Sequence, residues 1–449
     1  MQGKEQEIAP ENQIKQSKNK KKTIIYCVCI ALAIVFSFCM GGLTYYLAQG
    51  EKARTVSWVV NNIDRNFLIF DESTGKVREF TAEDYADAIV NSLNDKYAKY
   101  YTSSQYSDVI ATSEGRHYGT GLAFYANSND TVVADVTGNS PAYKQGIREG
   151  DIILGGRTSP EAQTVLFSDY ESLSSFLTAR EPGEEFELDY ISSSNGYKST
   201  ATISKRAYVS NYVYYTDYQY QVEFLSLEDE SKLLFSQTIN GNPKLDKNSA
   251  IIKLEAFDGN AGEYFGKMMD YAKSVGKNKI ILDLRDNGGG YMHELEKVAS
   301  YLVCSNENNT LIAIAKDKNG NAKSFRTSGN NFNKDITKIV VIANENSASA
   351  TECLIGAMLH YKNSFSQNNL IVVNDGDAKP CHTFGKGIMQ TTYSNLFTGE
   401  AIKLTTAYVY QPDGNKCIHK TGIYAEIENS FNDDNLALEH AINLLKANN

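Results

Sequence analysis

The stretch NENSASATE, Asn344 to Glu352, follows the apolar run KIVVIA and precedes CLIGAMLHY, a run with helical apolar spacing. This order predicts a strand, a tight turn of small residues and the start of a helix. The first N–H groups of a helix lack partners within it, and such donors can stabilise an oxyanion that forms beside them. The middle serine, Ser349, is therefore a candidate nucleophile.

The same serine also has a purely structural interpretation. Serine is a favoured N-cap residue, and Glu352 three residues after Ser349 completes the pattern of a capping box. In that case the two side chains would only satisfy backbone groups at the start of the helix. The turn taken alone leaves both interpretations open.

The length and composition of the chain indicate a folded protein of several domains. Its 449 residues exceed one average domain, so two or three are expected. Hydrophobic residues make up 42% and charged residues 22%, and 29 tyrosines favour strands and amphipathic surfaces. The net charge of -10, without a clustered basic face in the body of the chain, argues against nucleic-acid binding.

The seven cysteines form no recognisable metal-binding or disulfide pattern. Three lie in an N-terminal apolar run, and the other four are far apart without a CxxC pair. We therefore expect no zinc site and no dense disulfide framework, although one or two disulfides stay open. The positions are Cys27, Cys29, Cys39, Cys304, Cys353, Cys381 and Cys417.

The N-terminus predicts a membrane anchor. Five closely spaced lysines precede an uncharged, mostly apolar run, residues 23–47, that is long enough to cross a bilayer as a helix. Lysines before the run and Glu51 after it place residues 1–22 in the cytoplasm and the rest of the chain outside. A cleaved signal peptide is the alternative, but the exit GGLTYYLAQG lacks a clean cleavage site. The clustered lysines are Lys15, Lys18, Lys20, Lys21 and Lys22.

Two segments with different sequence patterns follow the anchor. Residues 51–111 carry helical spacing in VSWVVNNIDRNFLIF and AEDYADAIVNSLNDKYAKYY, which predicts a small helical region. Residues 112–207 alternate short β-type runs with turns. The runs are GTGLAFYA, DTVVADV, GDIILGG, EEFELDYI and STATISKR, with the helical DYESLSSFLTAR between the third and fourth.

The order of features in residues 112–207 resembles a PDZ domain, which is mainly β with helices. The resemblance rests on YGTGLAF at the first strand, NSPAYKQGIREGD in the middle and the late helix. A PDZ domain holds a peptide's terminal carboxylate on backbone N–H groups of a glycine-flanked loop while the peptide adds as a strand. An ordinary glycine turn is the alternative. The implied loop is Tyr118, Gly119, Thr120 and Gly121, and the implied pocket residues are Leu122 and Phe124.

Residues 208–449 have an α/β pattern. Strand candidates SAIIKLEAF, KIILDLR and TKIVVIAN alternate with helix candidates GEYFGKMMDYAKSV and HELEKVASYLV. Within this region LDLRDNGGGYM, Leu282 to Met292, runs from a buried-type strand into Asn287 and three glycines. Glycines let a backbone approach a substrate and direct N–H groups at its carbonyl oxygen, although an ordinary tight turn also fits. The spacing matches neither GxGxxG nor a Walker loop, so a nucleotide site is disfavoured.

The segment HTFGKGIMQTTY supplies a candidate general base. Lys386 lies between two glycines, and a lysine desolvated in a small-residue pocket has a lowered pKa and can accept a serine proton. A solvated surface lysine is the alternative. Gln390 follows four residues later and can orient the amine in a turn or at a helix end. A Ser–His pair is disfavoured, because no histidine has a partner at an evident spacing. The histidines are His117, His293, His360, His382, His419 and His440.

Together NENSASATE, DLRDNGGG and TFGKGIMQ resemble the catalytic signature of the carboxyl-terminal processing, or tail-specific, proteases, which are PDZ-containing Ser-Lys serine peptidases. SLNDKYAKYY, AIKLTTAYVYQPDGNKCIHKTGIYAEIE and DDNLALEHAINLL are similar to further segments of that family. The resemblance implies a multidomain protein whose residues 208–449 are the α/β catalytic domain. It also implies Ser349 as nucleophile, Lys386 as general base and Gln390 as the residue that holds Lys386. The implied oxyanion donors are the backbone N–H groups of Ala350 and Gly290.

Two kinds of departure from the family pattern are present. Thr351 stands where a serine is common and Gly288 where a proline is common, and both changes preserve the chemistry. Lys386 follows Ser349 by 37 residues (386 − 349), roughly a dozen more than the pattern, an extension that loop-closure entropy tolerates. We expect the extra residues within YKNSFSQNNLIVVNDGDAKPCH, near the active site.

These features predict a membrane-anchored, extracytoplasmic serine endopeptidase that recognises protein C-termini through its PDZ domain and cleaves by an acyl-enzyme. Its partners would be protein or peptide substrates with accessible C-termini and, through one helix, a bacterial cell membrane. No metal or organic cofactor is implied. The alternative is a catalytically impaired PDZ scaffold that binds tails without cleaving them. The physiological substrate and the oligomeric state stay open.

Overall fold

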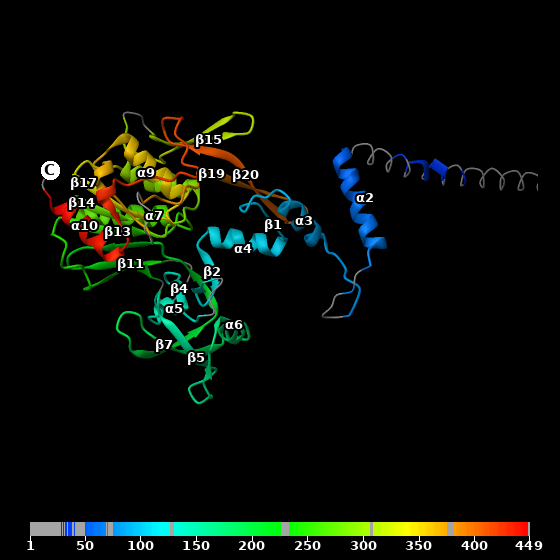
Figure 1. Cartoon of the computed structure of the whole chain (residues 1–449), viewed down its shortest axis with the longest axis horizontal. Coiled ribbons are helices and arrows are strands. Elements are labelled where there is room, and N and C mark those ends of the chain that lie inside the picture. The colour runs from blue at the N-terminus through cyan, green and yellow to red at the C-terminus, as the bar shows by residue number, and fades with distance from the viewer. Residues whose placement is uncertain are drawn as a thin grey trace, which may run out of the picture. The chain divides into compact units, whose positions relative to one another are not determined.

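The computed structural model divides the chain into two compact units, residues 1–92 and 93–449 (Figure 1). Nearly all of the second unit and the later part of the first are described. The described residues are 28, 30, 32–33, 35–37, 40, 50–68, 70, 75–125, 130–225, 233–305, 309–374 and 381–447.

The first unit holds helices α2 (Glu51–Asn66) and α3 (Ala82–Asn91). The ring of Phe80 lies 5.7 Å from that of Phe67 and 5.8 Å from that of Tyr85, measured between centroids. In the part of the chain that the structure describes, no helix has the length and hydropathy that a bilayer crossing requires. Most of residues 23–47, where the sequence predicts the anchor, lies outside the described residues, as do residues 1–22.

Within residues 51–111 the structure departs from the helical spacing of the run AEDYADAIVNSLNDKYAKYY at its end. Helix α4 (Ser103–Ser113) follows as expected, but Lys99–Tyr101 form strand β1. Strand β1 pairs antiparallel with β20 (Ala401–Tyr410), with Tyr100 opposite Ile402. The helical spacing of the segment is local, whereas a three-residue strand exists only through a partner about three hundred residues away, which local spacing cannot reveal.

The next part of the second unit is rich in β-structure and has its own core. Every run predicted as a strand or helix in residues 112–207 contains one. Strand β2 (Arg116–Gly119) pairs with β9 (Arg206–Val209), β3 (Leu122–Phe124) pairs with β4 (Val133–Val136), and a four-stranded sheet has the order β6-β5-β7-β8. The remaining elements are α5 (Pro141–Lys144), β5 (Ile152–Arg157), β6 (Val165–Leu166), α6 (Tyr170–Thr178), β7 (Glu185–Ile191) and β8 (Lys198–Ser204). Fully buried Ile147, Ile153, Leu173 and Leu188 lie at the centre of its core.

A mixed eight-stranded sheet with the order β12-β11-β10-β13-β14-β17-β18-β21 dominates the rest of the unit. Its pairs are antiparallel up to β13 and parallel from β13 to β21. The strands are β10 (Val213–Thr216), β11 (Gln221–Leu225), β12 (Leu234–Thr238), β13 (Ser249–Leu254), β14 (Lys279–Asp283), β17 (Lys338–Asn344), β18 (Leu370–Val373) and β21 (Ser430–Phe431).

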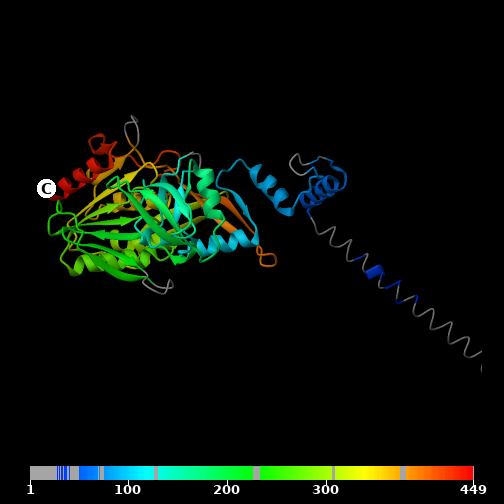
Figure 2. The ribbon, with the colours of Figure 1, turned by 90° about the horizontal axis from the view of Figure 1, so that it is seen from below.

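Helices cover both faces of this sheet. Residues of α7 (Ala261–Ser274), α8 (Met292–Leu302) and α9 (Ala350–Tyr361) pack on one face, and α10 (Asp434–Lys446) packs on the other (Figures 1 and 2). Successive residues of a strand point to opposite faces, which explains why β17 reads as a continuous apolar run. The side chains of Ile339 and Val341 belong to the core under α7, α8 and α9, while that of Val340 belongs to the core under α10.

An antiparallel five-stranded sheet completes the unit. It contains β1, β15 (Leu311–Asp317), β16 (Ala322–Arg326), β19 (Ile388–Ser394) and β20. Strand β20 is central, since β19 pairs along one edge while β1 and β15 share the other. The short helices η1 (Gln367–Asn369) and η2 (Ile427–Asn429) lie in connections. The loops after the parallel strands β13, β14 and β17 lie at the same edge of the large sheet, where functional residues of α/β proteins gather.

Candidate active site

Ser349 lies between β17 and α9 in a strained conformation. Its φ of 58° and ψ of -114° fall outside the regions that a serine ordinarily occupies. Bonds to the preceding loop fix the turn: the Ser347 hydroxyl donates to the carbonyl of Leu284 at 2.7 Å, and the N–H of Ala348 donates to the carbonyl of Asn287 at 3.0 Å. The strain is thus imposed by neighbouring structure, which is typical of functional turns.

The glycine loop after β14 is joined to this turn through Asn287, which is fully buried. The Asn287 side-chain amide donates to the carbonyl of Leu254 at 2.8 Å, and its oxygen accepts the N–H of Gly289 at 3.0 Å. The hydroxyl of Thr351 donates to the Asn287 carbonyl at 2.8 Å. A serine could make the same bond, so Thr351 preserves this contact.

The last two glycines of the loop are required by close packing. A Cβ on Gly289 would lie 2.8 Å from the Cβ of Ser349, and φ there is 99°. A Cβ on Gly290 would lie 2.5 Å from the carbonyl oxygen of Phe257. Because the flanking Gly289 carbonyl and Tyr291 N–H bond to Phe257, as in a parallel ladder, the N–H of Gly290 is directed away from Phe257. A Cβ on Gly288 meets nothing within 4 Å.

Glu352 connects the serine turn to the segment that contains Lys386. It is fully buried, and its Oε1 accepts the Thr383 hydroxyl at 2.6 Å and the Gly385 N–H at 2.7 Å. Its Oε2 accepts the backbone N–H groups of Ser349 and Lys386, both at 2.9 Å. Four donors therefore meet one carboxylate. The capping-box pattern identified the bond to Ser349, but nothing in the sequence indicated the other three.

Lys386 lies in the loop before β19, with its side chain half-buried. Its Nζ is 4.9 Å from the centre of the Tyr97 ring. Burial lowers the pKa of the Lys386 amine, the charges of Lys403 and Lys96 lower it further, and Glu352 opposes them. A lysine with a lowered pKa can accept a proton near neutral pH more readily than a solvated one. The contribution of Tyr97 and Lys96, from the segment before β1, was not visible in the sequence.

Gln390 lies in strand β19, not in a turn or at a helix end as the sequence suggested. Because a strand advances about 3.3 Å per residue, the spacing of four between Lys386 and Gln390 does not bring them side by side, as it would on the face of a helix. Among the hydrogen bonds of the described residues, the Gln390 amide donates to Thr405 Oγ1 at 3.3 Å and makes none to Lys386.

A cavity of about 1020 Å³ brings the candidates together: Ser349, Lys386, Gln390 and Gly290 all line it. Ala350 is fully buried directly after Ser349. Burial, together with the charge of Glu294, raises the pKa of the lining residue Asp258 to about 6. Other lining residues are Tyr101, Asp108, Tyr291, Glu296, Lys323, Phe325, Cys353, Ile388, Met389, Lys403 and Val409.

The histidines do not supply a better base. His293 lines the cavity, but its Nε2 is 3.2 Å from the buried carboxylate of Glu294. His382, the histidine nearest to Lys386 in sequence, has its Nδ1 2.6 Å from the carbonyl of Thr383. A Ser–His pair therefore receives no support from this geometry.

The extra residues between Ser349 and Lys386 are partly regular structure. NNLIVV contains β18, which lies beside β17 in the large sheet, and residues 375–380 lie outside the described residues. No disulfide joins the four cysteines of this unit, so the disulfides left open by the sequence are not present among the described residues.

The six residues predicted for peptide binding lie at the β2–β3 turn, and none is among the described residues that line the cavity. The Tyr118 side chain is exposed, while the carbonyl of Thr120 accepts the N–H of Ala142 at 3.0 Å. Phe124 on β3 lies 5.8 Å from Tyr170 on α6. Gly119 has φ 144°, and Gly121 has φ 81°. Leu122, also on β3, is half-buried.

Comparison with known proteins finds similarity to serine peptidases. Residues 248–429 match the family described as Peptidase family S41. A "Probable CtpA-like serine protease" of Staphylococcus haemolyticus is 24% identical over 398 residues, which cover 88% of this chain and 68% of that protein. A protein of the same description from Staphylococcus saprophyticus is 24% identical over 428 residues, covering 93% and 75%.

Among solved structures, the photosystem II D1 C-terminal processing protease is similar over 87% of this chain and 91% of its own, with 21% identity and a TM-score of 0.46. The chain spans between 68% and 75% of the length of the two staphylococcal relatives. On the family match and these relatives, the chain carries a domain of peptidase family S41 and is a serine-type peptidase.

Proposed function

We propose that this peptidase is a membrane-anchored, extracytoplasmic endopeptidase that cleaves by a Ser-Lys acyl-enzyme mechanism. The observation that carries the proposal is that Ser349, Lys386 and Gly290 line one cavity in which the pKa of the lysine is lowered. A nucleophile, a base and an oxyanion donor within one cavity are the requirements of acyl transfer.

In the proposed reaction the Ser349 hydroxyl attacks the scissile carbonyl while the neutral Lys386 amine takes its proton. The N–H groups of Gly290 and Ala350 stabilise the oxyanion of the tetrahedral intermediate. The Lys386 ammonium then returns the proton to the leaving amine, and the acyl group stays on Ser349. Lys386 then takes a proton from water, which attacks this ester, and the Lys386 ammonium gives that proton to the departing Ser349 oxygen. The new C-terminal acid leaves and ionises in solution.

Two further residues act on Lys386 in this proposal. Glu352 fixes its backbone, because the same carboxylate oxygen accepts the N–H groups of Ser349 and Lys386. Gln390, which lines the same cavity, orients the amine by exchanging its bond to Thr405 for one to the Lys386 Nζ. Gln390→Ala should therefore lower kcat more than it raises KM, since the peptide itself loses no contact.

The proposed peptide-binding part is a PDZ domain formed by residues 112–207. Two features support it. Among the described strands, β3 pairs only with β4, so its other edge has free backbone groups to which a peptide strand can add. Strand β3 and helix α6 lie next to each other, and the rings of Phe124 and Tyr170 are in contact between them. Residues 23–47 would hold the enzyme in the membrane with residues 1–22 in the cytoplasm.

The test uses the full chain, a fluorophosphonate that labels active serines, and a peptide with an apolar C-terminus. The unaltered enzyme should be labelled and should cleave, whereas Ser349→Ala and Lys386→Ala should do neither. Ser274→Ala, at the exposed end of α7, is the matched control and should behave like the unaltered enzyme. Full cleavage by Ser349→Ala would refute the mechanism. Binding of the peptide without labelling or cleavage would instead support the scaffold alternative, which the serine protease relatives disfavour.

A further inference from the structure

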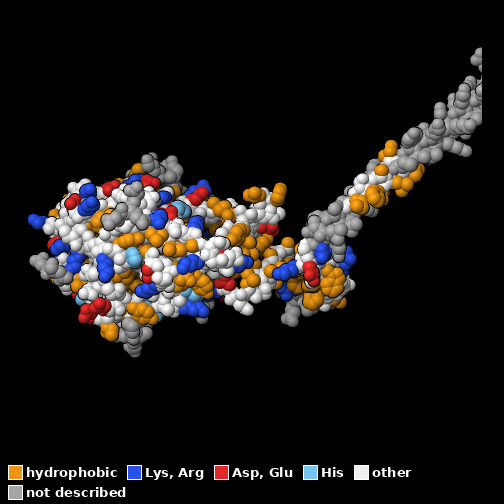
Figure 3. Space-filling model, turned by 90° about the horizontal axis from the view of Figure 1, so that it is seen from above, with side chains coloured by type: hydrophobic (Ala, Val, Ile, Leu, Met, Phe, Trp, Pro, Cys, Tyr) orange, Lys and Arg blue, Asp and Glu red, His pale blue; other side chains and the backbone are white. Residues whose placement is uncertain are grey.

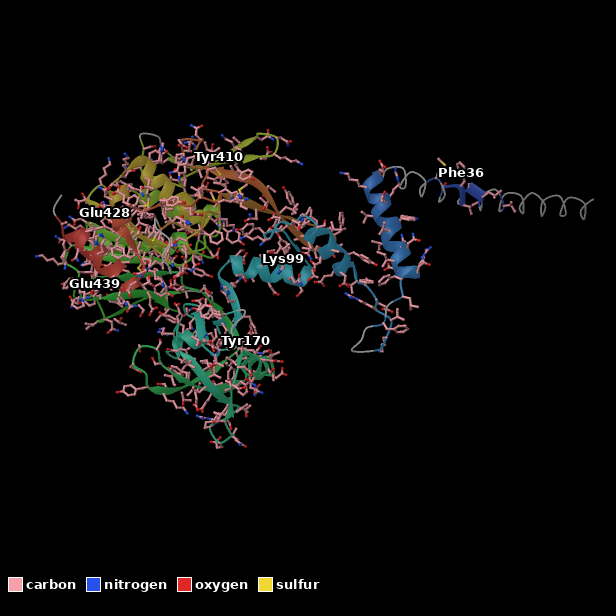
Figure 4. All side chains as sticks on the ribbon, viewed as in Figure 1. Phe36, Lys99, Tyr170, Tyr410, Glu428 and Glu439 are labelled. Carbon is pink, nitrogen blue, oxygen red and sulfur yellow. The ribbon has the colours of Figure 1, made fainter. Side chains whose placement is uncertain are left out.

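Four lysines lie around two tyrosine rings, and two of these lysines, Lys386 and Lys403, line the catalytic cavity. The Tyr97 ring has Lys96 Nζ at 5.0 Å and Lys386 Nζ at 4.9 Å. The Tyr101 ring has Lys99 Nζ at 5.3 Å and Lys403 Nζ at 5.7 Å. Lys99, labelled on β1 in Figure 4, is directly opposite Lys403 of β20 in the strand register. We call Lys96, Lys99, Lys386 and Lys403 the lysine cluster.

No ion pair of the described residues holds a member of the lysine cluster, although the chain carries ten more negative than positive charges. The Glu352 carboxylate nevertheless raises the pKa of the Lys386 amine. Like charges opposite each other on neighbouring strands are destabilising. The tyrosine rings compensate only part of this cost, because a cation held by an aromatic face keeps its charge.

Lys403 is the member of the lysine cluster, besides Lys386, that lines the cavity. It is half-buried, it lines the cavity together with Ser349, and it lies opposite Thr392, another lining residue. A cavity with low-dielectric walls concentrates such a field and favours an anion inside it. Lys386 does not serve as this cation in the proposed mechanism, because it works as a neutral amine. The acidic lining residues Asp108, Asp258 and Glu296 come from other elements: α4, the loop after β13, and α8.

On the face of the molecule seen in Figure 3, the described lysine and arginine side chains are spread among acidic and apolar ones and do not form one basic face. The lysine cluster instead gathers four cations around two tyrosine rings. Its concentration of one sign occurs beside the catalytic residues.

We propose that Lys403 forms a carboxylate-binding subsite in the cavity and selects substrates that carry a carboxylate within a few residues of the scissile bond. This inference rests on the proposed function, because the cavity must hold the peptide. The carboxylate is either the C-terminal carboxylate of the substrate or an Asp or Glu side chain. The ammonium of Lys403 would bind it by a charge-assisted hydrogen bond, with the field of Lys99 adding to the attraction.

Lys403 also has a second effect that must be separated from binding. Its charge is among the causes that lower the pKa of Lys386. Removing it therefore changes the base for every substrate alike and moves the pH dependence of cleavage. A carboxylate subsite instead changes the ratio between matched substrates, and this ratio does not depend on the state of the base.

The experiment measures kcat/KM of the full-length enzyme for three versions of one peptide. The first has a free C-terminal carboxylate, the second is its C-terminal amide, and the third is the amide with one Asn near the scissile bond replaced by Asp. We expect the unaltered enzyme to prefer one carboxylate version over the plain amide by about tenfold or more, as charge-assisted hydrogen bonds allow. The preferred version identifies the source of the carboxylate.

Three variants decide the proposal. Lys403→Gln should reduce the preference to about twofold or less, and Lys403→Arg should keep most of it. Lys273→Gln, which removes an exposed lysine at the end of α7, should retain the full preference. A preference that persists in Lys403→Gln, as recognition by the PDZ domain alone would give, would overturn the subsite while leaving the peptidase intact. Absence of cleavage and of serine labelling in the unaltered enzyme would contradict the proposed function instead.

Discussion

The serine turn and the lysine segment, residues 344–352 and 381–390, are positioned in different ways. The serine turn joins a central strand to a buried helix and is bonded to the neighbouring glycine loop through Asn287. The lysine segment has no regular structure before β19, and Glu352 holds its backbone while Tyr97 faces its amine. The proposed nucleophile is thus fixed by its local fold, whereas the proposed base depends on single contacts from distant segments.

The largest effect should come from removing the contact shared by the two regions. In Glu352→Gln an amide replaces a carboxylate oxygen, so two of the four donors would face an NH₂ group instead of an acceptor. We expect a loss of about 3–5 kcal/mol in the free energy of unfolding, the scale found when one partner of a buried charged network is removed. Cleavage should fall by about a hundredfold or more, because the proposed nucleophile and base lose their relative position.

The control for this substitution is Glu428→Gln, which alters an exposed carboxylate labelled in Figure 4. It should change neither the unfolding midpoint in urea nor the rate of cleavage. If Glu352→Gln had the same stability and activity as this control, the buried carboxylate would not be what joins the two regions.

The second largest effect should come from crowding the serine turn itself. Gly289→Ala places a Cβ 2.8 Å from that of Ser349 at a φ of 99°. We expect a cost of about 2–4 kcal/mol from strain and overpacking, and a loss of activity of about tenfold to a hundredfold.

Gly288→Ala provides the matched comparison, since its Cβ meets no atom within 4 Å. Thermal unfolding and cleavage rates of the two alanine variants should therefore differ sharply, although the positions are adjacent. Equal tolerance at both positions would mean that the glycine loop does not press against the nucleophile.

The contrast between the regions also explains what the sequence could predict. The strand before Ser349 and the helix after it appear as predicted, because apolar periodicity is a local property. The same holds for β14 and α8, which flank the glycine loop. Segments whose structure follows from their own pattern were therefore recognised without any partner.

The rest depended on contacts between distant positions. Strand β1 has three residues and exists because β20 pairs with it, so its sequence was read as helix. The capping-box pattern indicated one of the four bonds to Glu352, since the others come from residues more than thirty positions away. Nothing in the spacing of residues 97 and 386 indicated that the Tyr97 ring lies against the lysine.

A smaller effect should follow from removing this ring. Tyr97→Leu takes away the aromatic face that lies 4.9 Å from the Lys386 Nζ, a contact worth about 0.5–1 kcal/mol at exposed sites. Because the ring stabilises the ammonium that forms as Lys386 takes the serine proton, we expect kcat to fall by about two- to fivefold at a pH where the free amine is neutral. Tyr97→Phe, which keeps the ring, should retain the activity of the unaltered enzyme. Equal losses in both variants would assign the effect to the hydroxyl and not to the ring.

The smallest effect concerns charge alone. Lys96 is exposed, and its charge is the weakest of the causes that lower the pKa of Lys386, after burial and Lys403. Lys96→Gln should raise this pKa, because a neighbouring cation that disfavours the ammonium is gone. Since the neutral amine is the active form in the proposed mechanism, the rise of kcat/KM with pH should move to higher pH. At pH values below this pKa, kcat/KM should decrease by about twofold. Salt screens exposed charges, so the difference from the unaltered enzyme should shrink as ionic strength rises. A shift that persists in high salt would mean that Lys96 acts through packing against Tyr97. The pKa of Lys386 would then depend on this packing and not, as we infer, on the charge of Lys96.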